Sequence, residues 1–144
     1  MPTPAAAAPA APAKKPTPTT DSALVLLAMF QREGRLVDFL RETLDGHDDA
    51  TVGALARDIH RGLRKVLDAH ITLEAVMPGD EGSGVTLPAG FDPWRVRVVG
   101  NVAGTPPWKG TLKHHGWRAA KVNLPKLAEG MDASVVAPAE VEIA

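Results

Sequence analysis

The spacing of apolar residues changes once along this chain, close to residue 70. Between Asp49 and His70 apolar side chains recur every three or four positions, whereas from Ile71 onward they mostly alternate with polar ones. The first spacing is typical of an amphipathic helix, and the second of a half-buried strand. Helices followed by strands favour an α+β domain. We expect an N-terminal antiparallel helix pair packed on a C-terminal antiparallel sheet or small open barrel of about five to six short strands.

Two helices are expected in the first half of the chain. The segment 23–44 has an apolar stripe but contains Gly34, so we expect either a kink there or two shorter helices that share one apolar face. The second helix is predicted over Asp49–His70, after the stretch DGHDD, whose acidic residues favour a helix N-terminus by capping. The short connection between the two helices favours an antiparallel pair.

Composition separates the first twenty residues from the rest. They are rich in alanine and proline and contain almost no bulky side chain, so we expect residues 1–20 to form a disordered tail. Lys14 and Lys15 follow the alanine tract instead of preceding it, which argues against a secretory signal and favours the cytoplasm. We expect residues 21–144 to form a single α+β domain, helical over 21–70 and rich in strands over 71–144.

The sequence lacks the residues that several kinds of chemistry require. Without cysteine there is no disulfide, thiol nucleophile or cysteine zinc site. His60 and His70 lie about 15 Å apart along a helix and cannot share one metal ion directly. Neither G-x-S-x-G nor H-E-x-x-H occurs, and GTPPWKG has prolines where a phosphate-binding loop needs N–H donors. We therefore predict no catalytic residue, cofactor or metal.

One stretch carries positive charge that its neighbours do not balance. Residues 93–128 contain seven lysines and arginines and no acidic residue, although the whole chain has a formal charge of −1. Such a stretch can bind an acidic protein surface, with Trp94 or Trp108 as an anchor, or it can bind nucleic acid. It can also be an ordinary solvated sheet surface, whose lysines prevent edge pairing. The near-neutral total charge weighs against nucleic acid.

Within this stretch, the sequence HHGW predicts a tight turn between two strands, because glycine takes the positive φ that such a turn needs. A two-residue loop at His115–Gly116 would place Lys113 opposite Arg118 on a basic face. The other face of this hairpin is apolar and is expected to face the core: Leu112, His114, Trp117 and Ala119. The residues that we expect to bind a partner are Trp108, Lys109, Lys113 and Arg118.

The segments QREGRLVDFL and GNVAGTPPWKG, the latter followed by HHGWRA, resemble the bacterial family known as domain of unknown function 2760 (DUF2760). The resemblance extends over residues 22–143. The chain departs from the family pattern at two positions. Leu63 stands where a small thiol residue is typical, and Ala69 stands where an acidic residue is typical. The family has no established activity. Its members are often encoded beside an Hsp70-type chaperone ATPase, so the resemblance implies an accessory or co-chaperone role.

These observations favour a non-catalytic protein-interaction or accessory module. Its expected partner is an Hsp70-type ATPase or another acidic protein surface. The alternative is a small enzyme or ligand-binding domain that uses His60 or His114 in a pocket between the helices and the sheet. Binding of single-stranded nucleic acid is a third hypothesis, and no membrane association is expected.

Overall fold

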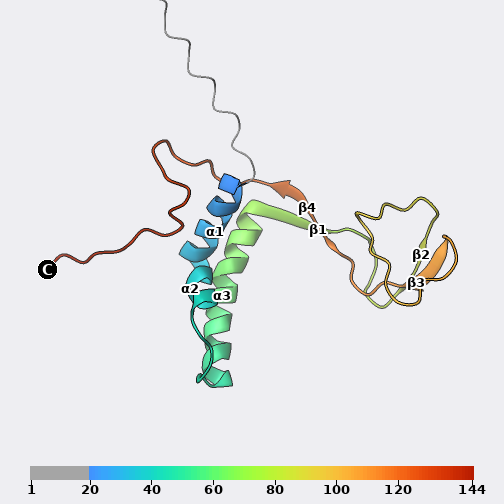
Figure 1. The fold of residues 1–144 in the computed structure, drawn as a ribbon, viewed down its shortest axis with the longest axis horizontal. Helices are drawn as coiled ribbons and strands as arrows, with labels where there is room; N and C mark the ends of the chain where they lie inside the picture. The colour runs from blue at the N-terminus through green and yellow to red at the C-terminus, as the bar shows by residue number, and fades with distance from the viewer. Residues whose placement is uncertain (1–19) are drawn as a thin grey trace, which may run out of the picture. The chain divides into compact units, whose positions relative to one another are not determined.

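The computed structural model describes residues 20–144 (Figure 1). Helices come first and short antiparallel strands follow, so the α+β prediction is confirmed. The chain forms two compact units: Ile71–Val122 make one, and the described residues on either side of this segment make the other. The predicted disordered tail lies outside the described residues, apart from Thr20, which begins the first helix.

The first helical segment is divided near Gly34, which is one of the two predicted alternatives. α1 spans Thr20–Gly34 and α2 spans Leu36–Arg41. Between them Arg35 has a φ of 54° and a ψ of 38°, which is the left-handed conformation. A helix cannot continue through a residue in this conformation, so α1 ends there.

This left-handed residue offers a test of the break between the helices. We expect Arg35→Gly to be more stable than Arg35→Ala by about 1 kcal/mol, because only a residue with a Cβ is strained at positive φ. In a helix interior the order is reversed, with alanine more stable by a similar amount. Both variants lose the exposed ion pair with Asp38, so comparing them by urea denaturation isolates the backbone effect. A more stable alanine variant would contradict the left-handed conformation.

Side chains cap the N-termini of the next two helices. The Gln31 Oε1 accepts a hydrogen bond from the backbone N–H of Val37, in the first turn of α2, at 2.9 Å. α3 spans Asp49–His70, the range that the sequence predicted. The Asp48 Oδ1 accepts a hydrogen bond from the backbone N–H of Thr51 at 2.8 Å. The hydrogen bonds with Thr51 lower the pKa of the Asp48 carboxyl, so the acidic stretch before α3 includes its capping residue.

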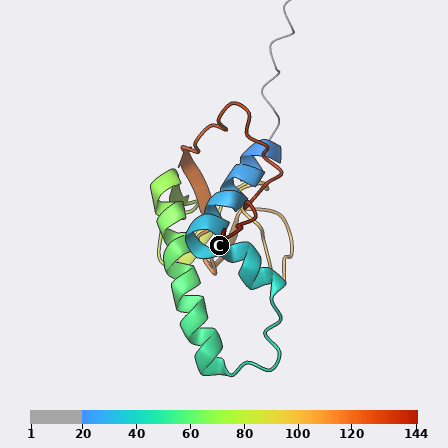
Figure 2. The same cartoon turned by 90° about the vertical axis from the view of Figure 1, so that its left-hand side faces the viewer.

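α1 packs along α3, as Figures 1 and 2 show. The buried side chains of these two helices are Met29, Ile59 and Val66. Gly62 of α3 lies against the backbone of α1, and a Cβ at this position would be 2.7 Å from the Gly34 Cα. Real Cβ atoms do not approach so closely, so a side chain at residue 62 would push the helices apart.

Four strands follow in the described residues, arranged as two separate two-stranded sheets. β1 (Ile71–Ala75) pairs antiparallel with β4 (Trp117–Val122). β2 (Gly84–Leu87) pairs antiparallel with β3 (Trp108–Thr111). The sequence predicted five to six strands in one sheet or barrel, and the structure differs in both respects.

Two segments in the half of the chain that was expected to be rich in strands, 94–102 and 134–143, contain no strand. The first begins in a turn, where the Asp92 Oδ1 accepts a hydrogen bond from the Trp94 N–H at 2.9 Å. Alternating apolar and polar residues show which side chains share a face of an extended chain. A strand also needs a hydrogen-bonded neighbour, and in residues 20–144 neither segment pairs with any of the four strands.

The predicted hairpin at His115–Gly116 is wrong. β3 and β4 pair with different partners, so Lys113 does not lie opposite Arg118. Arg118 lies opposite Glu74 of β1 instead, and its Nη1 is 3.0 Å from the Glu74 Oε2. Opposite charges across a ribbon stabilise it, whereas two like charges in the hairpin would destabilise it. Gly116 does take a positive φ of 73°, but in a connection between the two sheets.

Because the strand pairing differs from the prediction, the side chains expected on each face of the hairpin also differ. Leu112 is buried, as expected, but Trp117 is 60% exposed instead of facing the core. Trp117 lies opposite Ala75 at the end of the β1–β4 ribbon. A two-stranded ribbon has no second layer of its own to cover a large side chain, and this leaves the indole in solvent.

Candidate partner-binding groove

A groove of about 860 Å³ lies within the unit Ile71–Val122. Its lining comes from β2, from β3, from the turn-rich segment 93–103, from the connection 112–116 and from residues 76–77, which follow β1. The indole Nε1 of Trp108 in β3 donates a hydrogen bond to the Ala103 carbonyl at 3.0 Å, which ties that segment to the sheet. The groove is therefore made of loops that a small sheet supports, a common arrangement for binding sites.

The inner part of the groove is apolar. Its buried and half-buried apolar residues include Val85, Leu87, Val96, Val98, Trp108 and Leu112. The Trp108 ring packs against Phe91, with 6.0 Å between the ring centroids, so this indole is held in place. Trp94, which also lines the groove, is 97% exposed. Of these two tryptophans, Trp94 is thus the one that is free to cover a partner's apolar side chain.

The rim of the groove is positively charged. Among the described residues that line it there are four basic side chains and no acidic one: Arg95, Arg97, Lys109 and Lys113. All four are exposed, and in residues 20–144 none of them makes an ion pair. Four like charges around one groove repel one another, and an anionic partner would relieve that repulsion.

The groove brings together three of the four residues that the sequence singled out for partner binding. Trp108, Lys109 and Lys113 line it, whereas Arg118 lies in the β1–β4 ribbon and pairs with Glu74. Arg95 and Arg97 were not among the residues that were predicted to bind a partner. They belong to the same acid-free stretch and alternate with Val96 and Val98, a pattern that could have marked them as one polar face.

One known protein family matches most of this chain. The family described as "Domain of unknown function (DUF2760)" matches residues 19–142. The chain belongs to this family. The match runs through both compact units, and the resemblance stated from the sequence is confirmed. Neither the curated proteins nor the solved structures contain a match to this DUF2760 chain.

The paired histidines of this DUF2760 protein also lie at the groove, and the Nδ1 atom of each has a local backbone partner. The rings of His114 and His115 stack with 5.1 Å between centroids. The His114 Nδ1 accepts a hydrogen bond from the Gly116 N–H at 3.0 Å, and the His115 Nε2 lies 3.7 Å from the Glu81 Oε1. In the described part of the chain, no group of three metal-binding side chains forms around them or elsewhere.

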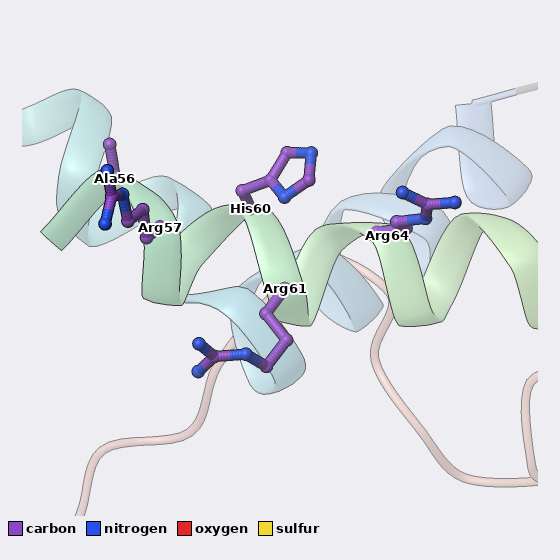
Figure 3. A pocket seen from close by; sticks show the side chains of 5 residues that line it. All are labelled: Ala56, Arg57, His60, Arg61 and Arg64. Carbon is purple, nitrogen blue, oxygen red and sulfur yellow. The ribbon is translucent and has the colours of Figure 1, made fainter. Parts of the chain in front are cut away.

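A second hollow, of about 640 Å³, lies on the solvent side of α3 (Figure 3). One helix supplies its whole lining: Ala56, Arg57, His60, Arg61 and Arg64. The side chains spread along the helix and do not converge on a common point (Figure 3). Arg61 and Arg64 already pair with acidic residues on the same helix. His60 is therefore exposed on an open surface and not enclosed in a polar pocket.

None of the helices in residues 20–144 combines the length and the apolar character that crossing a membrane requires.

Proposed function

We propose that this DUF2760 protein is a non-catalytic interaction module, and that its groove binds an acidic, partly apolar region of a partner protein. The observation that carries this proposal is the set of four basic side chains, without an ion-pair partner in residues 20–144, over an apolar floor. The basic rim would attract and orient an acidic partner, and the apolar floor with the exposed Trp94 would supply contact energy.

The partner that we propose is an Hsp70-type chaperone ATPase in the bacterial cytoplasm. The support for this choice is the family context, because members of the family are often encoded beside such an ATPase. The chemistry of the groove adds a requirement on the partner: the contact region of the ATPase must carry carboxylates next to apolar side chains. A basic or uncharged region would leave the four cations of the groove unpaired.

Reversing charge in the groove should weaken this binding. We expect Lys109→Glu/Lys113→Glu to lower the affinity for the purified ATPase at least about tenfold, because two attractive contacts become repulsive. Titration calorimetry at moderate salt measures the change. The affinity of the unmodified protein should also fall as salt rises, since exposed charges are screened. Both lysines are exposed, so the thermal midpoint should change little.

The matched control is Lys121→Glu/Lys126→Glu. It makes the same change in charge at two exposed lysines that do not line the groove. Arg118 is a poor choice for either variant, because its reversal would place two carboxylates opposite each other in the β1–β4 ribbon. Equal loss of affinity in the groove variant and the control would show that the affinity depends on the net charge of the protein and not on the groove. Unchanged affinity in the groove variant would rule out the groove as the binding site.

A further inference from the structure

Another segment of the chain has the chemistry that would fill the groove. Residues 140–143 have the sequence Glu-Val-Glu-Ile, in which carboxylates alternate with branched apolar side chains. The segment is not part of a strand, and Val141 and Ile143 are 79% and 85% exposed. Branched apolar side chains at such exposure favour binding to another surface.

We infer that residues 140–143 of one copy bind in the groove of a second copy. This inference rests on the proposed function of the groove, and names one acidic segment that it accepts. In an extended segment, successive side chains point to opposite faces. Val141 and Ile143 can therefore face the apolar floor while Glu140 and Glu142 face the basic rim.

The groove can also offer backbone hydrogen bonds to an extended segment. β3 contributes Lys109, Gly110 and Thr111 to the lining. Among the described residues β3 pairs only with β2, so one of its edges has no strand partner there. An extended peptide that adds to such an edge gains main-chain hydrogen bonds, and its alternate side chains then provide specificity.

The inference commits to a second copy as the occupant, because the carboxylates of its segment 140–143 complement the basic side chains of the groove. The exposure of Val141 and Ile143 leaves both side chains available to another molecule. The expected consequence is self-association that increases with protein concentration. Self-association would also compete with any other acidic partner for the same groove, which would make partner binding depend on the concentration of the protein.

A peptide of residues 138–144, PAEVEIA, tests the contact directly. The peptide contains no aromatic residue, so the intrinsic fluorescence of the protein reports its binding. The Trp117→Phe variant leaves Trp94 and Trp108, which both line the groove, as the only tryptophans. We expect a saturable change in fluorescence with PAEVEIA and none with the charge-reversed PAKVKIA. The Lys109→Glu/Lys113→Glu variant should not respond to PAEVEIA.

Sedimentation of the full chain over a range of concentrations tests self-association. We expect Glu142→Lys to weaken it at least about tenfold, and the control Glu129→Lys, an exposed acid outside the segment, to leave it unchanged. Combining Glu142→Lys with Lys113→Glu should restore part of the lost association, because opposite charges are paired again. Such rescue would not follow from a merely structural effect of either substitution.

The outcomes separate this inference from the proposed function. A chain that stays monomeric and ignores PAEVEIA, but binds the ATPase through Lys109 and Lys113, overturns the inference and leaves the proposed function standing. Self-association that none of these substitutions changes also overturns it, because a different surface is then responsible. If the unmodified protein binds neither PAEVEIA nor the ATPase, both the inference and the proposed function are overturned.

Discussion

Replacing Gly62 with alanine should lower the free energy of unfolding of the helical unit by about 1–3 kcal/mol, the usual cost of overpacking a close contact. The added Cβ would lie 2.6 Å from the Glu33 carbonyl carbon and 2.7 Å from the Gly34 Cα. Both are backbone atoms of α1, so no side-chain rotation can relieve the contact, and the helices must separate. Urea denaturation followed by circular dichroism at 222 nm measures the loss, since the described helices all lie in this unit.

Gly53→Ala is the matched control. Gly53 lies in the same helix, and a Cβ there would meet nothing within 4 Å. Alanine is favoured over glycine in an open helix position, so this variant should gain up to about 1 kcal/mol. The two substitutions are chemically identical and differ only in what surrounds them. If both variants gained stability, the close approach of α1 to α3 at Gly62 would be excluded.

Truncating Leu112 to alanine should destabilise the unit Ile71–Val122 by about 2–4 kcal/mol, the usual cost of removing a buried leucine side chain. Leu112 is 7% exposed, and it is the buried hydrophobic residue within 71–122. Its backbone also holds the connection between the sheets, since its N–H donates to the Ser83 carbonyl at 2.8 Å and its carbonyl accepts from the Gly82 N–H at 2.7 Å. The substitution keeps these backbone bonds and removes only packing.

Tryptophan fluorescence reports this unit, because all three tryptophans lie in it. We expect Leu112→Ala to move the fluorescence transition to lower denaturant concentration. Leu73→Ala removes the same atoms from a side chain that is 36% exposed, so it should cost less than Leu112→Ala does. Equal shifts for Leu112→Ala and Leu73→Ala would mean that Leu112 is not a core residue.

The helices could be predicted from the sequence because their signals are local. The three-and-four spacing and the acidic cap together define Asp49–His70, and Gly34 marks the break between α1 and α2. The residue that takes the left-handed conformation was harder to predict from the sequence. Glycine is the usual choice, but here it is Arg35, because Gly34 is required where α1 meets Leu63 of α3.

Strand pairing could not be predicted in the same way, because the partners lie far apart in the sequence. The HHGW turn is a good local signal for a hairpin, yet β3 pairs with residues 84–87 and β4 with residues 71–75. Alternation alone also failed to separate the true strands from segment 94–102, which lines a groove instead.

The sequence by itself determined the α+β order, the range of α3 and the acid-free stretch that supplies every basic residue of the groove. These properties depend on residues that are neighbours along the chain. Only the tertiary structure decided that Arg95 and Arg97 join Lys109 and Lys113 around one groove, while Arg118 is neutralised by Glu74 in the other sheet. That division depends on contacts between distant strands, whose register is set by packing and charge pairing across the ladder and not by any local propensity.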